Sequence, residues 1–189
     1  MKIVEIKILR GPNYWSIRRP KLIQMKLDLE EMEQKPSNEM PGFKEKLEKL
    51  LPGLYVHRCS EGVHGGFLSR VEDGTWMGHI IEHVALELQT LAGMDMGFGR
   101  TRTTGKDGEY FVVFDYMEEE AGVYAAYRFH FISFSDQHSC IFSQSNPKAL
   151  RVGCDRLHQP SKASTFFKMT VEYYIIHETQ ASCNFYFSF

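Results

Sequence analysis

The stretch that decides the fold of this chain is Gly78-His79-Ile80-Ile81-Glu82-His83-Val84. It lies within a run of helix formers at residues 75–92, whose apolar residues form one broad face. The two histidines and the glutamate lie opposite that face, flanked by Trp76 and Leu86 rather than by the lysines and glutamates of a surface helix. We therefore expect a central helix that is covered on both sides, with its polar residues in a cleft.

The order of the polar residues in this helix indicates a metal site. His79 and His83 are one helical turn apart, so that both imidazoles can bind one metal ion. Glu82 lies beside them and can take a proton from water that the metal activates. His-x-x-Glu-His is the inverted form of the zinc-peptidase helix motif. The sequence predicts a zinc site with His79 and His83 as ligands and Glu82 as the catalytic base.

A third ligand must come from another segment, and Cys59 is the first choice. A thiolate binds zinc strongly, and the glycines around Cys59 let the backbone come close to the helix. In peptidases with the inverted motif the third ligand is a downstream glutamate. Four other candidates therefore stay open: His57, His64, Glu119 and Glu120.

Three other interpretations of the histidines remain. His79 and His83 can be a buried pair that is hydrogen-bonded within the fold. They can also join His57 and Cys59 in a closed, purely structural zinc site. Finally, Cys59 can act as a nucleophile with His57 or His83, although no group that would orient the histidine is evident.

Two pairs of arginines are candidates for binding a substrate's carboxylates. Arg100 and Arg102 lie in the glycine-rich basic segment at residues 97–103, which we expect to be a loop. Arg18 and Arg19 follow two aromatic residues. The alternatives are a solvated loop for the first pair and aromatics that only cover the core for the second. No phosphate-binding GxxxxGK[ST] loop is present.

The remaining pattern predicts an α+β fold in one small domain. We expect about four to five strands in a mixed or antiparallel sheet, about three helices, and the helix at 75–92 packed on one face. The expected strands lie at residues 2–9, 22–29, 66–71 and 109–117. The expected flanking helices run from near residue 41 to 51 and from residue 118.

Composition indicates an ordinary globular protein. The chain has 189 residues, 43% hydrophobic content and a net charge of −2, which gives no signature of nucleic-acid binding. No apolar run reaches the roughly 20 residues of a membrane span. The four cysteines form no CxxC pair. We expect a cytoplasmic protein that binds neither nucleic acid nor membrane.

Several stretches of residues 1–126 match those of a known family. They are Leu9-Arg10-Gly11-Pro12-Asn13-Tyr14-Trp15-Ser16, Lys35-Pro36-Ser37-Asn38-Glu39, Gly65-Gly66-Phe67, Gly74-Thr75-Trp76-Met77-Gly78-His79-Ile80-Ile81-Glu82-His83-Val84-Ala85-Leu86-Glu87-Leu88-Gln89, Gly97-Phe98-Gly99-Arg100-Thr101-Arg102 and Glu119-Glu120-Ala121-Gly122. In combination they resemble the N-terminal domain of the cyanophycin synthetases.

The resemblance implies a larger, homo-oligomeric enzyme. In that family an ATP-grasp domain and a Mur-ligase-like domain follow, and they use ATP and magnesium to add aspartate and arginine to cyanophycin, a polymer with a polyaspartate backbone. Neither domain fits in this chain, so ligase activity is not assigned to it. We expect this domain to bind the polymer and to cleave it as a zinc-dependent endopeptidase, which makes primers. The alternative is a non-catalytic polymer-binding module or a structural zinc domain.

The end of the chain departs from the family. Residues 127–189 are rich in serine, phenylalanine, cysteine and histidine, and residues 135–165 show no consistent helical or strand period. We interpret residues 1–126 as the family-like domain, and residues 127–189 as a divergent or frameshifted, poorly ordered tail.

Overall fold

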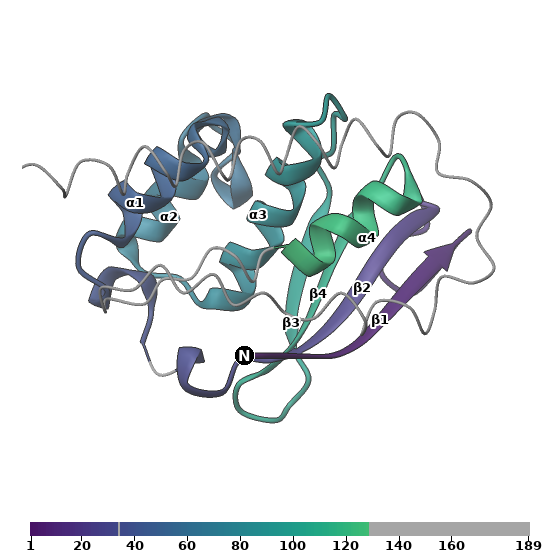
Figure 1. Ribbon diagram of the computed structural model, residues 1–189, viewed down its shortest axis with the longest axis horizontal. Coiled ribbons are helices and arrows are strands. Elements are labelled where there is room, and N and C mark those ends of the chain that lie inside the picture. Colours follow the sequence, from purple (N-terminus) through teal and green to yellow (C-terminus); the bar gives the residue numbers. More distant parts are fainter. Residues whose placement is uncertain (34, 129–189) are drawn as a thin grey trace, which may run out of the picture.

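The computed structural model describes residues 1–33 and 35–128, which form an antiparallel four-stranded sheet with helices on one face (Figure 1). The strands are β1 (Lys2–Arg10), β2 (Lys21–Asp28), β3 (Gly99–Thr103) and β4 (Glu109–Asp115), in the order β1-β2-β4-β3. This arrangement confirms the predicted α+β class. The predicted tail lies outside the described residues from residue 129 onward, so its expected disorder stays a prediction.

The helices are α1 (Phe43–Leu50), α2 (Gly66–Asp73), α3 (Met77–Thr90) and α4 (Glu119–Arg128). The central helix α3 lies on β3 and β4 and also contacts α4, and α4 lies against β2 (Figure 1). Two short 3-10 turns, Pro52–Val56 and Cys59–Glu61, connect α1 to α2. They bring the Cys59 segment to the side of α3 that faces away from α4 (Figure 1).

Burial along α3 agrees with the predicted helix at 75–92. Every residue from Ile80 to Gln89 is buried, including the charged Glu82 and Glu87. The apolar residues join the main core, and each fully buried leucine or isoleucine contributes roughly 1.5–3 kcal/mol to stability. A helix with so little polar surface must be covered on several sides. Here the cover comes from the sheet, from α4 and from the segment around Cys59 and α2.

The alternation of residues along each strand gives the sheet two different faces. On β2, Ile23, Met25 and Leu27 belong to the main core beneath the helices, whereas Leu22 belongs to a smaller cluster with Trp15 and Val113. Directly opposed residues of an antiparallel pair share a face. We call the side under α3 and α4 the helix face, and the side covered by Trp15 the outer face.

Residues 66–71 form the start of α2, and the predicted strand there is wrong. The apolar Phe67, Leu68 and Val71 are buried together, which requires helical spacing on one side rather than alternation. The helix begins after Gly65, which has φ +82° and a left-handed backbone that a side-chain-bearing residue rarely adopts. The glycines near Cys59 were expected to let the backbone come close to the central helix, and Gly65 in addition starts α2.

Residues 97–103 were expected to be a loop, but Gly99–Thr103 form strand β3. Within the described residues, strand β3 lies at the edge of the sheet and pairs only with β4, and it carries arginines on one face. Its polar composition is compatible with a strand because an edge position leaves one face in water. Composition alone therefore gave the wrong element.

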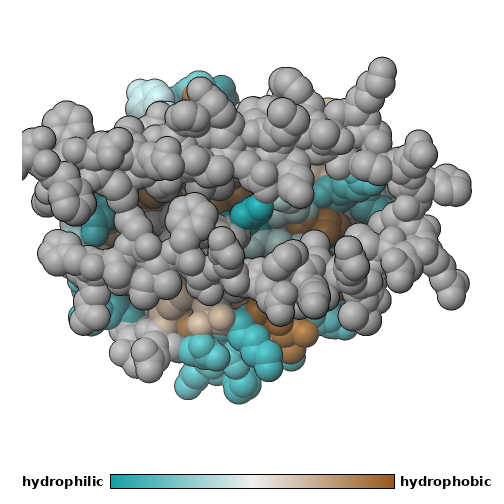
Figure 2. Space-filling model, viewed as in Figure 1, coloured by the Kyte–Doolittle hydropathy of each residue, from teal (hydrophilic) through white to brown (hydrophobic). Residues whose placement is uncertain are grey.

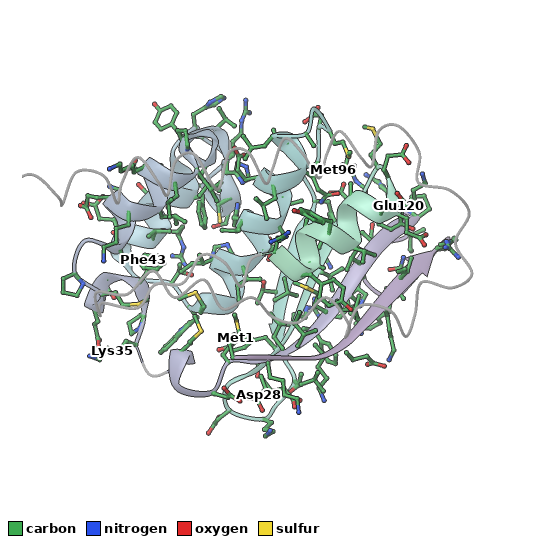
Figure 3. The ribbon with its side chains drawn as sticks, in the orientation of Figure 1. Met1, Asp28, Lys35, Phe43, Met96 and Glu120 are labelled. Carbon is green, nitrogen blue, oxygen red and sulfur yellow. The ribbon has the colours of Figure 1, made fainter. Side chains whose placement is uncertain are left out.

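Met1 and Asp28 lie at the same end of the β1–β2 pair, as the register of Lys2 with Asp28 requires (Figure 3). Hydrophilic side chains gather at the lower edge of the space-filling view, where the β3–β4 turn lies (Figure 2). Along the part of the chain that the structure describes, no helix combines the length and apolar character needed to cross a membrane.

Candidate metal centre and substrate pocket

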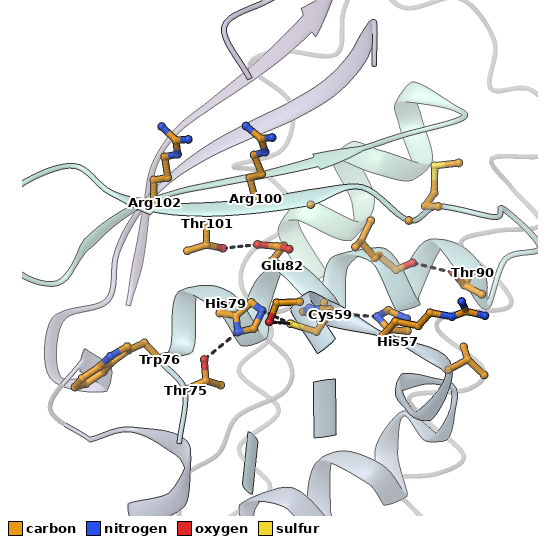
Figure 4. Close-up of a pocket in the computed structure, with 18 of the residues that line it drawn as sticks. His57, Cys59, Thr75, Trp76, His79, Glu82, Thr90, Arg100, Thr101 and Arg102 are labelled. Atoms are coloured by element: carbon orange, nitrogen blue, oxygen red, sulfur yellow. Dashed lines mark hydrogen bonds between the residues drawn. The ribbon is translucent and has the colours of Figure 1, made fainter. Parts of the chain in front are cut away.

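Three potential metal ligands come together beside α3. Cys59 Sγ lies 3.3 Å from His79 Nε2 (Figure 4). The ligand atoms of Cys59, His79 and His83 all lie within 4.8 Å of one another. The two histidines come from successive turns of the helix, as their spacing predicts. Cys59 comes from the adjoining 3-10 turn with φ +52°, a left-handed conformation that costs a non-glycine residue about 1–2 kcal/mol.

A hydrogen bond turns His79 toward this group. The Thr75 hydroxyl lies 2.9 Å from His79 Nδ1, which leaves Nε2 facing the Cys59 sulfur. When Nε2 binds a metal, the proton of the neutral ring is on Nδ1 and is donated to Thr75 Oγ1. Thr75 thus fixes both the orientation and the tautomer that metal binding needs.

A chain of two hydrogen bonds orients His83. Its Nδ1 lies 2.9 Å from Nδ1 of His57, and Nε2 of His57 lies 3.1 Å from Glu87 Oε2. If each ring carries one proton, His57 donates to the Glu87 carboxylate and accepts from His83 Nδ1–H. The lone pair of His83 is then on Nε2, which is free to bind a metal. Sequence reasoning considered His57 as a ligand or as the partner of a Cys59 nucleophile, but not as a residue that orients His83.

Glu87 is a functional candidate that sequence reasoning missed. It is only 1% exposed, and Gly53 makes the room for it, since a Cβ at residue 53 would lie 1.9 Å from Glu87 Oε1. A signal was available: Glu87 is four residues after His83, among the apolar residues of a helix. Charged residues at such positions are rarely buried without a partner. The partner, His57, could be found only from the structure.

Burial keeps the histidines of this group neutral. It lowers the pKa of His79, and it lowers that of His83 to about 2, with smaller contributions from His79 and His57 nearby. Both residues therefore have a free lone pair at neutral pH, which is the form that binds metals. The Phe67 ring stacks on His83 with 4.0 Å between centroids and supplies part of this apolar cover.

Glu82 lies beside the three candidate ligands but is not one of them. Its carboxylate accepts a hydrogen bond of 2.7 Å from Thr101 Oγ1 on β3 (Figure 4). Burial raises the pKa of Glu82 to about 7, and the bond from Thr101 offsets part of that effect. Gly99 makes room for it, because a Cβ at this position would lie 2.4 Å from Glu82 Oε1.

These groups line one pocket of about 890 Å³ between α3, β3 and the Cys59 segment. Trp76, which is 45% exposed, also lines it. The pocket combines three ligand atoms, a carboxyl with a raised pKa and partly apolar walls. That combination is typical of an active site.

Comparison with known proteins then places the chain in a family. The family model described as cyanophycin synthase-like N-terminal domain matches residues 24–131 of the chain. The chain belongs to this family. It is 65% identical over 125 residues to the cyanophycin synthetases of Geminocystis herdmanii and Nostoc sp., and 62% identical to that of Synechocystis sp.. The matched region is 66% of this chain but only 14% of each of these relatives.

Within this cyanophycin synthase-like domain, Arg100 and Arg102 line the pocket but project from the other side of β3. They are opposed by Val113 and Phe111 of the outer face, and their side chains point away from Glu82 (Figure 4). The Arg102 guanidinium lies 5.9 Å from the centroid of the Trp15 ring. Both arginines are exposed, so they can reach a ligand at the pocket's rim rather than the metal group.

The other predicted arginines lie in the loop that covers the outer face. Arg19 pairs with the buried Asp115 at 3.2 Å, so it anchors this loop to β4. Arg18 is exposed. Trp15 is buried and donates from Nε1 to Gln24 Oε1 at 2.6 Å. For Trp15 the packing interpretation of the aromatics holds.

Of the four alternative third ligands, His57 lies against His83 with 2.9 Å between their Nδ1 atoms, and the other three are not members of the metal group. Nε2 of His64 lies 3.1 Å from Arg58, and Glu119 accepts from Nε of Arg10 at 3.1 Å. Glu120 is exposed on the first turn of α4. In the described part of the chain, Cys59 is the candidate whose ligand atom lies within 4.8 Å of those of His79 and His83.

Proposed function

We propose that this domain is a zinc-dependent endopeptidase that binds cyanophycin and cleaves amide bonds of this aspartate-arginine polymer. The observation that carries the proposal is the group formed by Cys59, His79 and His83, with the carboxyl of Glu82 beside it in one pocket. The relatives named cyanophycin synthetase support the choice of polymer. The short chains released would be primers that the ATP-grasp and Mur-ligase-like domains of a whole enzyme extend with ATP and magnesium.

The donor set fits zinc in a catalytic rather than a structural site. Two neutral imidazoles and one thiol are the ligands that zinc prefers, and catalytic sites use three protein ligands with one position left open. A fourth ligand would close the site. His57 is the nearest candidate, but its nitrogens already lie 2.9 Å from His83 and 3.1 Å from Glu87. This supports an open, three-ligand site.

The residues around the site have distinct roles in the proposed reaction. Zinc bound there would polarise the scissile carbonyl and lower the pKa of a water molecule. Glu82 takes a proton from that water, whose oxygen attacks the carbonyl carbon. When the C–N bond breaks, the same carboxyl returns the proton to the leaving amine. Burial raises the pKa of Glu82 to about 7 in the metal-free domain, and a cation bound beside it would favour the carboxylate form that accepts the proton.

A polymer-binding module without catalysis is the second candidate function. The exposed Arg100 and Arg102 at the pocket rim favour it, because they can bind carboxylates whether or not a metal is present. Zinc content separates the two candidates. About one equivalent per chain, measured by elemental analysis, supports the metal site, and none supports the module.

Glu82→Gln is the direct test of hydrolysis. The amide keeps the size of the side chain and its hydrogen bond from Thr101, but it cannot accept a proton. We expect zinc content to be unchanged and polymer cleavage to fall by about 10²–10⁴-fold. The measurement is the size distribution of purified cyanophycin after incubation with each protein, with and without a chelator. Equal cleavage by the wild type and the variant would falsify the role of Glu82.

A further inference from the structure

Strand β3 presents a free edge to the pocket. Phe98 O accepts from Asp115 N at 2.9 Å, and Thr104 N donates to Glu109 O at 3.0 Å. In an antiparallel pair, residues bonded to the partner strand alternate with residues whose N–H and C=O point away from it. With the observed register, the even positions from 98 to 104 face β4. The backbone groups of Gly99, Thr101 and Thr103 therefore point to the free edge.

These three residues offer six backbone groups for pairing. Among residues 1–33 and 35–128, no hydrogen bond to the N–H or C=O of Gly99, Thr101 or Thr103 is recorded. Such an edge is a template for another extended chain unless it is protected. The opposite edge of the sheet, β1, is interrupted by a register shift between Ile3 and Glu5. Strand β3 has a regular register with β4 and no proline or lysine.

The free edge passes the catalytic candidates. Thr101 Oγ1 contacts Glu82 Oε2 at 2.7 Å and the carbonyl oxygen of Gly78 at 3.2 Å, so the middle of β3 lies directly over α3. Gly99 lies against the Glu82 carboxylate as well. A chain paired with β3 would therefore run along the same pocket that contains Cys59 and the two histidines (Figure 4).

We propose that the free edge of β3 binds the main chain of its substrate as an added strand. The ligand class is an extended polyamide with carboxylate-bearing side groups. Main-chain hydrogen bonds to Gly99, Thr101 and Thr103 hold it in register and present one amide to Glu82. The presentation of a scissile amide rests on the proposed function above, whereas the binding mode does not.

The arrangement of charge along β3 fits such a ligand. Side groups of an added strand point alternately to the two faces of the sheet. Those on the outer face come close to Arg100 and Arg102, whose guanidinium groups are exposed there. Guanidinium groups bind carboxylates with two parallel hydrogen bonds. Backbone pairing supplies binding along the edge, and the arginines select side groups that carry a carboxylate.

The first test compares Thr103→Pro with Thr103→Ala. Proline removes the outward N–H, and an edge strand tolerates it there because this N–H is not part of the ladder. Thr103→Ala is the matched control, since both changes remove the hydroxyl that accepts from Gly105 N. The full chain also carries Glu82→Gln, so that binding is measured without cleavage. The probe is a fluorescently labelled synthetic oligomer of polyaspartate with arginine on its side chains, followed by anisotropy.

We expect Thr103→Pro to weaken binding by about fivefold relative to Thr103→Ala, the loss typical of one hydrogen bond. Zinc content is measured in the same samples. Equal affinities for the two folded variants would overturn the added-strand mode. Absence of zinc or of cleavage in the wild-type chain, which keeps Glu82, would instead overturn the proposed function, while the difference in binding between the two variants would still report on the edge.

A second probe keeps the proposal testable if Thr103→Pro does not fold. An oligomer of the same length and charge, but with N-methylated backbone amides, cannot donate to the carbonyl groups of β3. On protein in which Thr103 is not substituted, we expect the N-methylated oligomer to bind at least about fivefold more weakly than the unmethylated oligomer. Equal binding of the two oligomers would mean that side-group charges alone hold the ligand, and it would overturn the proposal.

Discussion

The two faces of strand β3 differ sharply in their surroundings. On the helix face, Thr101 and Gly99 lie against Glu82, and the adjoining Glu82 and His83 are each 6% exposed. On the outer face, Arg100 and Arg102 extend from the same strand into solvent. Because side chains alternate along a strand, β3 has the buried, titratable Glu82 and His83 on one side and the permanently charged Arg100 and Arg102 on the other.

The difference separates reactivity from attraction. Burial raises the pKa of Glu82 and lowers that of His83. At neutral pH Glu82 can therefore accept and return a proton, and the neutral His83 can bind a metal. Arginines at the same depth would pay a large desolvation cost and would keep metal cations away. Placing them on the outer face leaves them able to bind the carboxylates of a polymer without disturbing the metal group.

Cys59→Ala is the change that tests the helix face most severely. It removes one of three candidate ligands, and we expect zinc content to fall from about one equivalent to near zero. Cleavage of cyanophycin should fall by about a thousandfold or more, since both the Lewis acid and the activated water are lost. The measurements are elemental analysis after dialysis and the rate of polymer cleavage.

Ser60→Ala is the matched control for this change. Its hydroxyl lies 3.8 Å from the Cys59 sulfur and lines the same pocket, but it is not a member of the ligand group. Zinc content equal to that of the wild type is expected for Ser60→Ala. If Cys59→Ala also keeps a full equivalent of zinc, Cys59 is not a zinc ligand. The proposed metal site on the helix face would then be contradicted.

The free energy of unfolding should show the cost of burying Glu82. The pKa of Glu82 is about 7 in the folded state and near 4.5 in the unfolded state. Protonated Glu82 therefore contributes its full share to the free energy of unfolding below pH 4.5, and this contribution is lost as pH rises to 7. Glu82→Gln imitates the protonated form at all pH values. Without metal, we expect the variant to be more stable than the wild type by up to about 3 kcal/mol at pH 8, and similar at pH 4.5.

Urea denaturation of both proteins in the presence of a chelator, at several pH values, measures this difference. An exposed glutamate on the first turn of α4 offers a control, because Glu120→Gln should not produce a stability gap that grows from pH 4.5 to 8. A constant gap between wild type and Glu82→Gln across that range would show that the carboxyl is not buried as described.

Glu87→Gln should weaken the metal site without removing a ligand. The amide keeps the volume of a side chain that is 1% exposed, but it loses the charge that orients His57 and, through it, His83. Partners behind a metal-binding histidine are typically worth 10–100-fold in metal affinity, so we expect about a tenfold loss. Competition with a chromophoric zinc chelator measures it. Unchanged affinity would make Glu87 a purely structural residue.

The helix face was largely predictable because its signals are local. The spacing of His79, Glu82 and His83 depends only on the helical period, and the apolar residues around them indicated a covered helix. The pairing of His57 with Glu87 was not predictable, because it joins residues 30 positions apart in the sequence. It also depends on the fold bringing Gly53, which has no side chain, next to the buried carboxylate of Glu87.

The outer face was harder to predict because its signals are not local. A segment with two arginines and two glycines looks like a loop, and only pairing with β4 makes it a strand. The faces to which Arg100 and Arg102 point depend on the register of that pairing, and a slip of one residue would exchange them with Thr101. The prediction of a strand at residues 66–71 was wrong for a similar reason, since packing decides between helix and strand in short apolar segments.

The smallest expected effects belong to the outer face. We expect Arg100→Ala and Arg102→Ala each to raise KM for cyanophycin about threefold, with kcat and zinc content unchanged, because exposed charge pairs contribute roughly 0.2–1 kcal/mol. Arg18→Ala, another exposed arginine, is the control, and its location in the Trp15 loop predicts a weaker effect. The threefold effects should shrink as salt rises, since exposed charges are screened. A loss of kcat or zinc in Arg102→Ala would mean that this guanidinium reaches around β3 to the metal group, and that the strand does not keep attraction and reactivity apart.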